Sequence, residues 1–296
     1  MAFNFQTFKT RALTALLFVA VMLVGLLWNS WSFLILFTII NFGCWFEYLK
    51  LLEKIFDISF KPYYKLSLVS GAFAVMLSCY FLFFQIAGLE VWNYIIPVLA
   101  LISLVLFIFT IFKIKKDIFL KASFAALGGV IYISIPLGLL VWLYLNVCFS
   151  RINNCDLCLG GRISLCIVFS IWVNDTMAYL VGSFIGRTPL TKISPKKTWE
   201  GTIGGVILCV IAIGFLYPLL IEKNSKNLVP QSTWFVIPAI CAIFGTLGDL
   251  LESKLKRMAD VKDSGSFMPG HGGFLDRFDS LLGAVPFVWL YVKLFV

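Results

Sequence analysis

Long apolar runs separated by short polar segments make up most of this chain of 296 residues. A helix needs about 20 residues to cross the hydrocarbon core of a bilayer, and nine runs approach that length. They cover residues 12–28, 31–52, 66–87, 92–112, 123–148, 163–186, 202–221, 233–251 and 280–296. The first run lacks a clear small-residue cleavage site, so we expect a retained helix and not a signal peptide. The pattern predicts an all-α polytopic membrane protein with about nine transmembrane helices.

The composition excludes an ordinary soluble domain. Hydrophobic residues make up 60% of the chain and charged residues 13%, whereas soluble domains carry about 25% charged residues. If the N-terminus lies inside, most of the 24 basic residues fall in inner segments, as the positive-inside rule requires. We therefore expect a cytoplasmic N-terminus in a bacterial-type inner (plasma) membrane. Inner lysines near anionic lipid explain the net charge of +9, and no nucleic-acid partner is expected.

Residue types differ between the two parts of the chain, although no linker or repeat divides it. Residues 1–120 contain spans without an acid deep in an apolar run, and we interpret them as an N-terminal transmembrane scaffold. In residues 121–296, glycine and proline become frequent. Such residues suit membrane helices that approach closely or line a cavity. We expect a polar cavity at the cytoplasmic face of this C-terminal half.

Three aspartates at the inner ends of spans are candidate metal ligands. Asp249 ends the eighth run, while Asp276 and Asp279 precede the ninth, so the topology brings all three to one membrane face. Asp276 and Asp279 are three residues apart, which places them on one face of a helix. Magnesium takes oxygen ligands, commonly one or two carboxylates together with substrate phosphates. The pattern predicts a Mg²⁺ site, and helix capping or ion pairing is the alternative for each aspartate alone.

Asp175 lies near the middle of the sixth run, beside Asn174. An acid at that depth is costly unless it faces a cavity, a cation or a partner. We expect Asp175 to be a further metal ligand, and a hydrogen bond to a neighbouring helix is the alternative.

Basic residues near these acids are candidates for phosphate binding. Asp249, Ser253 and Lys256 occupy positions i, i+4 and i+7, so one helical face would present an acid, a hydroxyl and an ammonium to one cavity. Lys196 and Lys197 follow Ser194 and Pro195 in a short inner loop, just before an expected helix.

The start of that helix adds to the prediction. Thr198 and Glu200 open it, and helix N-termini bind phosphate readily. A purely capping role for Glu200 is the alternative.

Cys155 and Cys158 form a CxxC pair in a loop expected outside. A zinc site needs about four ligands, and no second pair or histidine lies nearby. The pattern favours a local disulfide or two unmodified thiols, and leaves their role open.

Three segments together resemble a known family. The first holds Asp175, Thr176, Ala178, Tyr179, Gly182 and Gly186, and the second runs from Lys196 to Gly205. The third, between 248 and 279, contains Ser253, Leu255, Lys256, Arg257, Lys262, Asp263, Pro269, His271, Gly272, Gly273, Asp276, Arg277 and Asp279. In type and spacing these residues resemble the phosphatidate cytidylyltransferases, or CDP-diacylglycerol synthases. Met268 departs from the pattern, where Leu, Ile or Phe is expected.

The resemblance implies transfer of a cytidylyl group from CTP to phosphatidic acid, with magnesium and with residues 121–296 as the catalytic region. It implies catalytic roles for Asp249, Asp276, Asp279, His271 and Lys256. His271, the single histidine, would position or protonate a phosphate oxygen. Substrate-binding roles are implied for Lys196, Lys197, Ser194, Ser253, Arg257, Lys262 and Arg277. A second cation and a homodimer stay open.

Other functions remain as alternatives. Another lipid-phosphate nucleotidyltransferase is the nearest, because no residue identifies cytosine directly. An ion-coupled transporter would explain Asp175 but predicts acids along a through-going path and related halves. A non-catalytic membrane scaffold would not explain the dense polar segment between 249 and 279.

Overall fold

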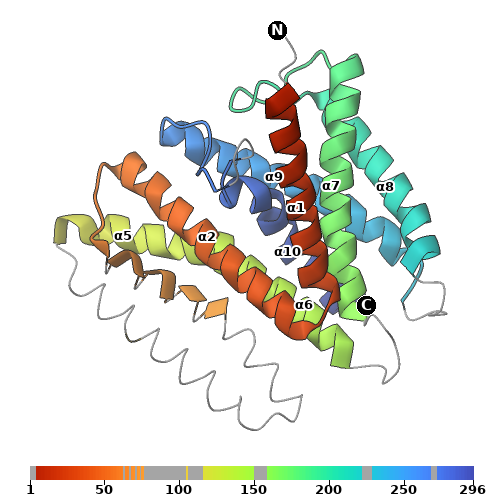
Figure 1. Ribbon diagram of the computed structural model, residues 1–296, viewed down its shortest axis with the longest axis horizontal. Coiled ribbons are helices and arrows are strands. Elements are labelled where there is room, and N and C mark those ends of the chain that lie inside the picture. Colours follow the sequence, from red (N-terminus) through yellow and green to blue (C-terminus); the bar gives the residue numbers. More distant parts are fainter. Residues whose placement is uncertain are drawn as a thin grey trace. The chain divides into compact units, whose positions relative to one another are not determined.

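A computed structural model of the chain describes residues 5–62, 64–66, 68–70, 72–73, 75–76, 105, 116–149, 159–221, 229–267 and 272–296. Helices account for its regular structure, as expected from the apolar runs (Figure 1). They are α1 (Phe5–Leu27), α2 (Ser30–Phe56), α5 (Lys116–Gly129), the π-helix η1 (Val130–Ser134), α6 (Ile135–Phe149), α7 (Leu159–Ile185), α8 (Trp199–Ile221), α9 (Thr233–Met258) and α10 (Leu275–Phe295).

Six helical stretches in the described part are long and apolar enough to cross a membrane. They are Ser30–Phe56, Ala126–Leu145, Leu159–Ile185, Trp199–Leu220, Thr233–Met258 and Leu275–Phe295. A shorter apolar helix, Leu13–Leu27, corresponds to the first predicted run. The chain is therefore an integral membrane protein. Most of the predicted runs 66–87 and 92–112 lies outside the described residues, so the count of nine spans and their orientation remain predictions.

The surface of α8 shows why these helices need lipid. Its exposed side chains include Ile203, Ile207, Ile211, Phe215 and Leu219. They repeat every four residues, so they form an apolar stripe along one side of the helix. Burying such a stripe in acyl chains removes apolar surface from water, which is favourable.

Two compact units make up the described chain. One comprises Met1–Val141 and Leu255–Phe278, and the other comprises Trp142–Lys254 and Asp279–Val296. The helices α6, α9 and α10 each contribute residues to both units. The sequence predicted a boundary at residue 120 between a scaffold and a catalytic region. That boundary was drawn from composition and remains a prediction, distinct from the two units described here.

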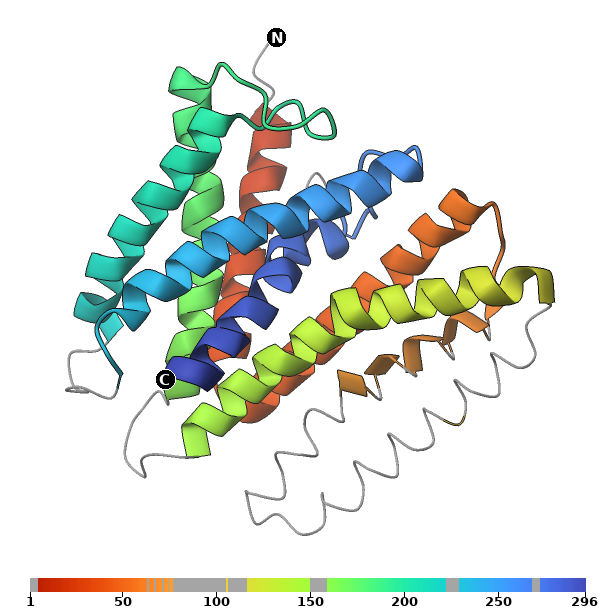
Figure 2. The same cartoon turned by 180° about the vertical axis from the view of Figure 1, so that it is seen from behind.

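In the first unit, α2 packs along α5 and η1 (Figures 1 and 2). The Asn29 side chain caps α2 by accepting a hydrogen bond from the Ser32 N–H at 2.8 Å. Further along, the Trp45 indole donates to the Ser134 hydroxyl at 2.8 Å, and that hydroxyl lies 3.3 Å from Asn41 Oδ1. This buried polar network meets the π-helical turn of η1, a rare irregularity that is frequent at functional sites.

In the second unit, α7 and α8 pack closely side by side (Figures 1 and 2). A Cβ added at Gly205 would lie 2.7 Å from the Cβ of Ala178, so the small residue permits this approach. Near the other end of α8, the Tyr217 hydroxyl donates to the Arg162 carbonyl oxygen. Small residues at a helix contact are typical of membrane proteins.

The helices α9 and α10 also cross closely within the second unit. A Cβ at Gly248 would lie 2.4 Å from the carbonyl oxygen of Asp279 and 3.0 Å from the Cα of Gly283. This contact brings two backbones together beside the acidic residues Asp249 and Asp279.

Candidate active site

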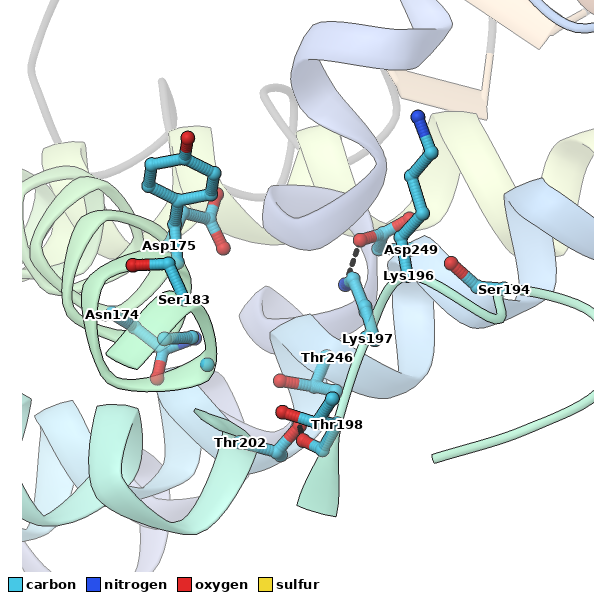
Figure 3. A pocket seen from close by; sticks show the side chains of 13 residues that line it. Asn174, Asp175, Ser183, Ser194, Lys196, Lys197, Thr198, Thr202, Thr246 and Asp249 are labelled. Carbon is cyan, nitrogen blue, oxygen red and sulfur yellow. Dashed lines mark hydrogen bonds and ion pairs between the residues drawn. The ribbon is translucent and has the colours of Figure 1, made fainter. Parts of the chain in front are cut away.

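A cavity of about 450 Å³ lies in the second unit (Figure 3). Its walls come from α7, the loop between α7 and α8, the start of α8, and α9. The lining residues are Asn174, Asp175, Ala178, Tyr179, Gly182, Ser183, Ser194, Lys196, Lys197, Thr198, Thr202, Thr246 and Asp249. The structure thus brings together five of the predicted site residues from three separate segments: Asp175, Ser194, Lys196, Lys197 and Asp249.

Asp175 and Asn174 form the α7 side of the cavity. The Asp175 side chain is exposed to this space, which fits the expectation that an acid inside an apolar span faces a cavity. Asn174 is buried, and its Oδ1 has no hydrogen-bond partner among the described residues. A buried polar atom without a partner is costly, so the wall offers one acceptor that a bound polar group could use.

The loop between α7 and α8 is held by Glu200. Its carboxylate accepts hydrogen bonds from the N–H groups of Arg187 at 3.1 Å and Thr188 at 3.2 Å. The N-cap of α8 is supplied by Thr198, whose hydroxyl accepts from the Gly201 N–H at 3.1 Å. Glu200 is therefore more than a cap for its own helix, because it fastens the start of the loop to the start of α8.

The two lysines of this loop differ in their contacts. Lys197 is half-buried, and its Nζ donates a hydrogen bond to Oδ2 of Asp249 in an ion pair. Lys196 is exposed and projects away from that pair (Figure 3). Oδ1 of Asp249 accepts from the Ser253 hydroxyl at 3.3 Å, as their i, i+4 spacing predicts.

An acidic cluster adjoins the cavity. Asp249, Glu252 and Asp279 each offer a carboxylate oxygen, and these oxygens lie within 4.8 Å of one another. Glu252 is fully buried, and Asp279 is 8% exposed with its Oδ1 accepting from the Ser280 N–H at 2.6 Å. Asp249 belongs to both the cluster and the cavity wall.

This cluster fits a divalent cation. Three neighbouring carboxylates repel one another unless positive charge is near, and magnesium prefers such hard oxygen ligands. Sequence reasoning missed Glu252. The signal was present, because Glu252 follows Asp249 by three residues on the same helix and so shares its face.

Asp276 belongs to a different group of contacts, in the first unit. Its carboxylate accepts from Lys256 Nζ at 2.6 Å, from the Ser264 N–H and hydroxyl at 2.9 Å each, and from the Gly273 N–H at 2.8 Å. These are the contacts of a carboxylate that closes a loop. Asp276 and Lys256 therefore pair with each other here, whereas the sequence predicted Asp276 beside Asp249 and Asp279 and placed Lys256 in the cavity with Asp249.

Three predicted phosphate-binding residues, Arg257, Lys262 and Arg277, are exposed. Arg257 contacts the Val261 carbonyl oxygen at 3.5 Å. The predicted residues His271, Cys155 and Cys158 lie outside the described part of the chain.

Glu47 on α2 was not considered by the sequence reasoning, which treated the N-terminal spans as scaffold. It is only 6% exposed, and its Oε2 accepts from the Ser264 hydroxyl at 2.8 Å and the Leu275 N–H at 2.9 Å. An acid of the N-terminal part thus contacts the segment that carries Asp276.

Known proteins similar to this chain share one name. The chain is 40% identical over 158 residues to a protein named phosphatidate cytidylyltransferase from Bacillus subtilis, covering 52% of this chain and 56% of the relative. A protein of the same name from Thermotoga maritima is 42% identical over 137 residues, 46% of this chain and 50% of the relative. In these matches the chain spans about half the length of the relatives.

A longer match covers nearly the whole chain. A protein named phosphatidate cytidylyltransferase from Staphylococcus haemolyticus is 31% identical over 281 residues, 94% of this chain and 96% of the relative. The sequence profile described as the cytidylyltransferase family matches residues 9–295. The chain therefore belongs to the cytidylyltransferase family.

Proposed function

We propose that this protein catalyses the reaction of CTP with phosphatidic acid to give CDP-diacylglycerol and pyrophosphate, a step of phospholipid biosynthesis. The observation that carries the proposal is the position of Asp249, which joins an acidic cluster to a cavity lined by lysines of the α7–α8 loop. The relatives named phosphatidate cytidylyltransferase supply the choice of substrates.

The reaction needs alignment and charge neutralisation more than a strong base. A phosphate monoester has a second pKa near 6, so phosphatidic acid already carries an anionic oxygen near neutral pH. That oxygen attacks the α-phosphorus of CTP and forms a new P–O bond. The bond from the α-phosphorus to the bridging oxygen breaks, and pyrophosphate leaves with that electron pair. Bringing polyanions together is the main obstacle, and positioned charges remove it.

The residues present fit magnesium, and we assign Asp249, Glu252 and Asp279 as its ligands, with Asp175 as a further acid across the cavity. Magnesium bound there would neutralise charge on the nucleotide phosphates. Lys196 and Lys197 bind phosphate groups from the loop side, and Ser194 lines the same wall. Lys256, which pairs with Asp276 in the first unit, remains a candidate phosphate-binding residue. Arg257, Lys262 and Arg277 remain candidates for the lipid phosphate.

We also propose that the site faces the cytoplasm of a bacterial-type inner membrane. Basic residues of the predicted inner segments support this orientation, and CTP is a cytoplasmic nucleotide. A cysteine placed at exposed Lys192, in a variant whose eight native cysteines are replaced by alanine, tests it. A membrane-impermeant thiol reagent should label that cysteine in inside-out vesicles and not in intact cells, and the opposite pattern would contradict the orientation.

The activity itself is tested with purified protein in detergent, phosphatidic acid and CTP labelled in its cytosine ring. We expect label to enter the lipid, with release of pyrophosphate, only when magnesium is present. Parallel incubations with UTP, ATP and GTP test the choice of base. Label from another nucleotide alone would indicate a different lipid-phosphate nucleotidyltransferase. No label from any nucleotide, in protein shown to be folded by circular dichroism, would overturn the proposal.

A further inference from the structure

Glu47 is a buried acid on α2, inside the predicted apolar run 31–52. It lies on α2 between Phe46 and Tyr48, and its side chain is almost fully removed from solvent. Burying a carboxylate is costly unless hydrogen-bond donors surround it. Its partners therefore explain why an acid occupies this position.

The partners shown for Glu47 lie far away in the sequence, on either side of the C-terminal polar loop. Ser264 donates its hydroxyl at 2.8 Å, and Leu275 donates its N–H at 2.9 Å. A Cβ at Gly265 would lie 2.1 Å from Oε1 of Glu47, and a Cβ at Gly273 would lie 2.2 Å from Oε2. Both glycines are needed for the backbone to approach the carboxylate this closely.

Glu47 also completes the N-terminus of α10. Leu275 is the first residue of that helix, and Phe274 before it has no side-chain oxygen that could cap it. The Glu47 carboxylate accepts the Leu275 N–H instead, and negative charge near a helix N-terminus is favourable. The Phe274 ring lies against Gly43, one turn before Glu47 on α2.

The same contacts lead to the pair of Lys256 and Asp276. The Ser264 hydroxyl lies 2.8 Å from Oε2 of Glu47 and 2.9 Å from Oδ2 of Asp276. Asp276 in turn accepts from Lys256 at 2.6 Å. A continuous chain of polar contacts therefore runs from Glu47 through Ser264 and Asp276 to Lys256, all within the first unit.

We propose that Glu47 is a positioning residue for the transferase reaction. It holds Ser264 and the first turn of α10 so that Asp276 keeps the Lys256 ammonium in place. The inference rests on the proposed function, because Lys256 matters only as a phosphate-binding cation. It assigns the N-terminal spans a part in the active machinery, beyond anchoring the chain in the membrane.

The test compares Glu47→Gln, Ser264→Ala and the double variant with the wild-type protein. We expect each single change to lower kcat by roughly 10- to 100-fold, the effect of small misplacements at a reacting centre. The double variant should lose no more than the worse single variant, because both residues act through one set of contacts. The proposal would be overturned if the kcat loss of the double variant equalled the product of the two single losses. It would also be overturned if the folded single variants kept the wild-type kcat.

The control is Glu53→Gln on the same helix. Glu53 pairs with Lys65 at 2.7 Å and accepts from the Phe60 N–H at 2.8 Å, so it has similar bonds in another place. We expect Glu53→Gln to lower the unfolding temperature without changing kcat. If Glu47→Gln does not fold, the kcat of Ser264→Ala alone tests the proposal. This variant removes one hydroxyl and leaves the carboxylates of Glu47 and Asp276 in place.

Hydrogen–deuterium exchange separates this inference from the proposed function. In Glu47→Gln, exchange at residues 275–278 should become faster, because the start of α10 loses its charged acceptor. Unchanged exchange would refute the positioning role. If the wild-type protein transferred no label from CTP to lipid, the proposed function would be refuted. The exchange experiment would still show whether Glu47 holds the start of α10.

Discussion

Lys197 in the α7–α8 loop donates a hydrogen bond to Asp249 on α9, although 52 residues separate them in the sequence. The pair connects the loop to the acidic cluster of Asp249, Glu252 and Asp279. The Lys197 ammonium therefore lies between the acidic cluster, which suits a metal ion, and the cavity, which suits phosphate. This lysine can pair with the Asp249 carboxylate in the free protein and with a substrate phosphate once substrate binds.

Lys197→Met should lower kcat/KM for CTP by roughly 10- to 100-fold, because it removes the hydrogen bond from the ammonium to a CTP phosphate. A hydrogen bond to a charged group contributes about 1.5–3 kcal/mol. Methionine keeps much of the length and removes the charge. Initial rates over a range of CTP concentrations measure the effect. Lys192→Met is the control, since Lys192 is an exposed lysine of the same loop. Equal kcat/KM in the two variants would contradict the role of Lys197.

Asp279→Asn and Glu252→Gln should each raise the magnesium concentration needed for half-maximal activity, because a neutral amide is a poorer ligand than a carboxylate. Magnesium should also raise the unfolding temperature of the wild-type protein more than that of either variant. Without magnesium, the unfolding temperature of each variant should be at least that of the wild type, because removing one of three neighbouring carboxylate charges relieves their repulsion. This measurement distinguishes a loss of metal binding from misfolding.

The control for these variants is Asp260→Asn. Asp260 is exposed beyond the end of α9 with φ of 53°, a conformation that asparagine tolerates well. Its magnesium dependence should match the wild type. A shift as large as that of Asp279→Asn would show that the acids act only through general surface charge.

Gly248→Ala should destabilise the protein by about 1–3 kcal/mol, the usual cost of overpacking, and lower activity. The added Cβ would lie 2.4 Å from the Asp279 carbonyl oxygen and force α9 and α10 apart. Gly245→Ala is a matched control on the same helix, because its Cβ would meet Ser280 at an ordinary 3.4 Å. Thermal unfolding in detergent and turnover measure both variants. Equal stability of the two would mean that the helix crossing is looser than described.

Glu200→Gln should raise KM for CTP more than it lowers kcat. The change weakens the acceptor for the N–H groups of Arg187 and Thr188, and each lost bond costs about 1 kcal/mol. The loop that carries Lys196 and Lys197 would then be held less firmly before substrate binds. Steady-state kinetics at varied CTP concentrations measure KM and kcat separately. A fall in kcat at unchanged KM would place Glu200 in the chemical step instead.

The positions of the membrane helices in the described part of the chain could be predicted from apolar runs, because a backbone in lipid must satisfy its own hydrogen bonds. Their ends could not. The run 233–251 stops before Glu252, yet α9 continues to Met258, and Glu252, Ser253 and Lys256 keep helical geometry beyond the apolar part. The run 280–296 likewise misses the first turn of α10, whose Leu275 N–H is satisfied by Glu47.

The candidate site could be predicted in its residue types but not in its pairings. Asp249 and Asp279 meet as expected, and the third acid beside them is Glu252. Asp276 and Asp279 are neighbours on one helix, but their surroundings differ: Ser264 and Lys256 surround the first, and α9 carboxylates surround the second. Such choices depend on which distant segment packs against each side chain, and spacing along one helix does not contain that information.

The contact between Glu47 and Ser264 spans 217 positions of the chain, and this separation has a consequence for biosynthesis. At roughly 5–20 residues per second, a ribosome needs about 10–45 seconds to make the intervening chain. During that interval α2 has left the ribosome while Glu47 still lacks the donors from Ser264 and Leu275. A chain that ends before Ser264 therefore carries a carboxylate in a mostly apolar helix without these two donors, and synthesis as far as Leu275 supplies them. The contact that orders the finished protein is therefore missing from every chain that ends before Ser264.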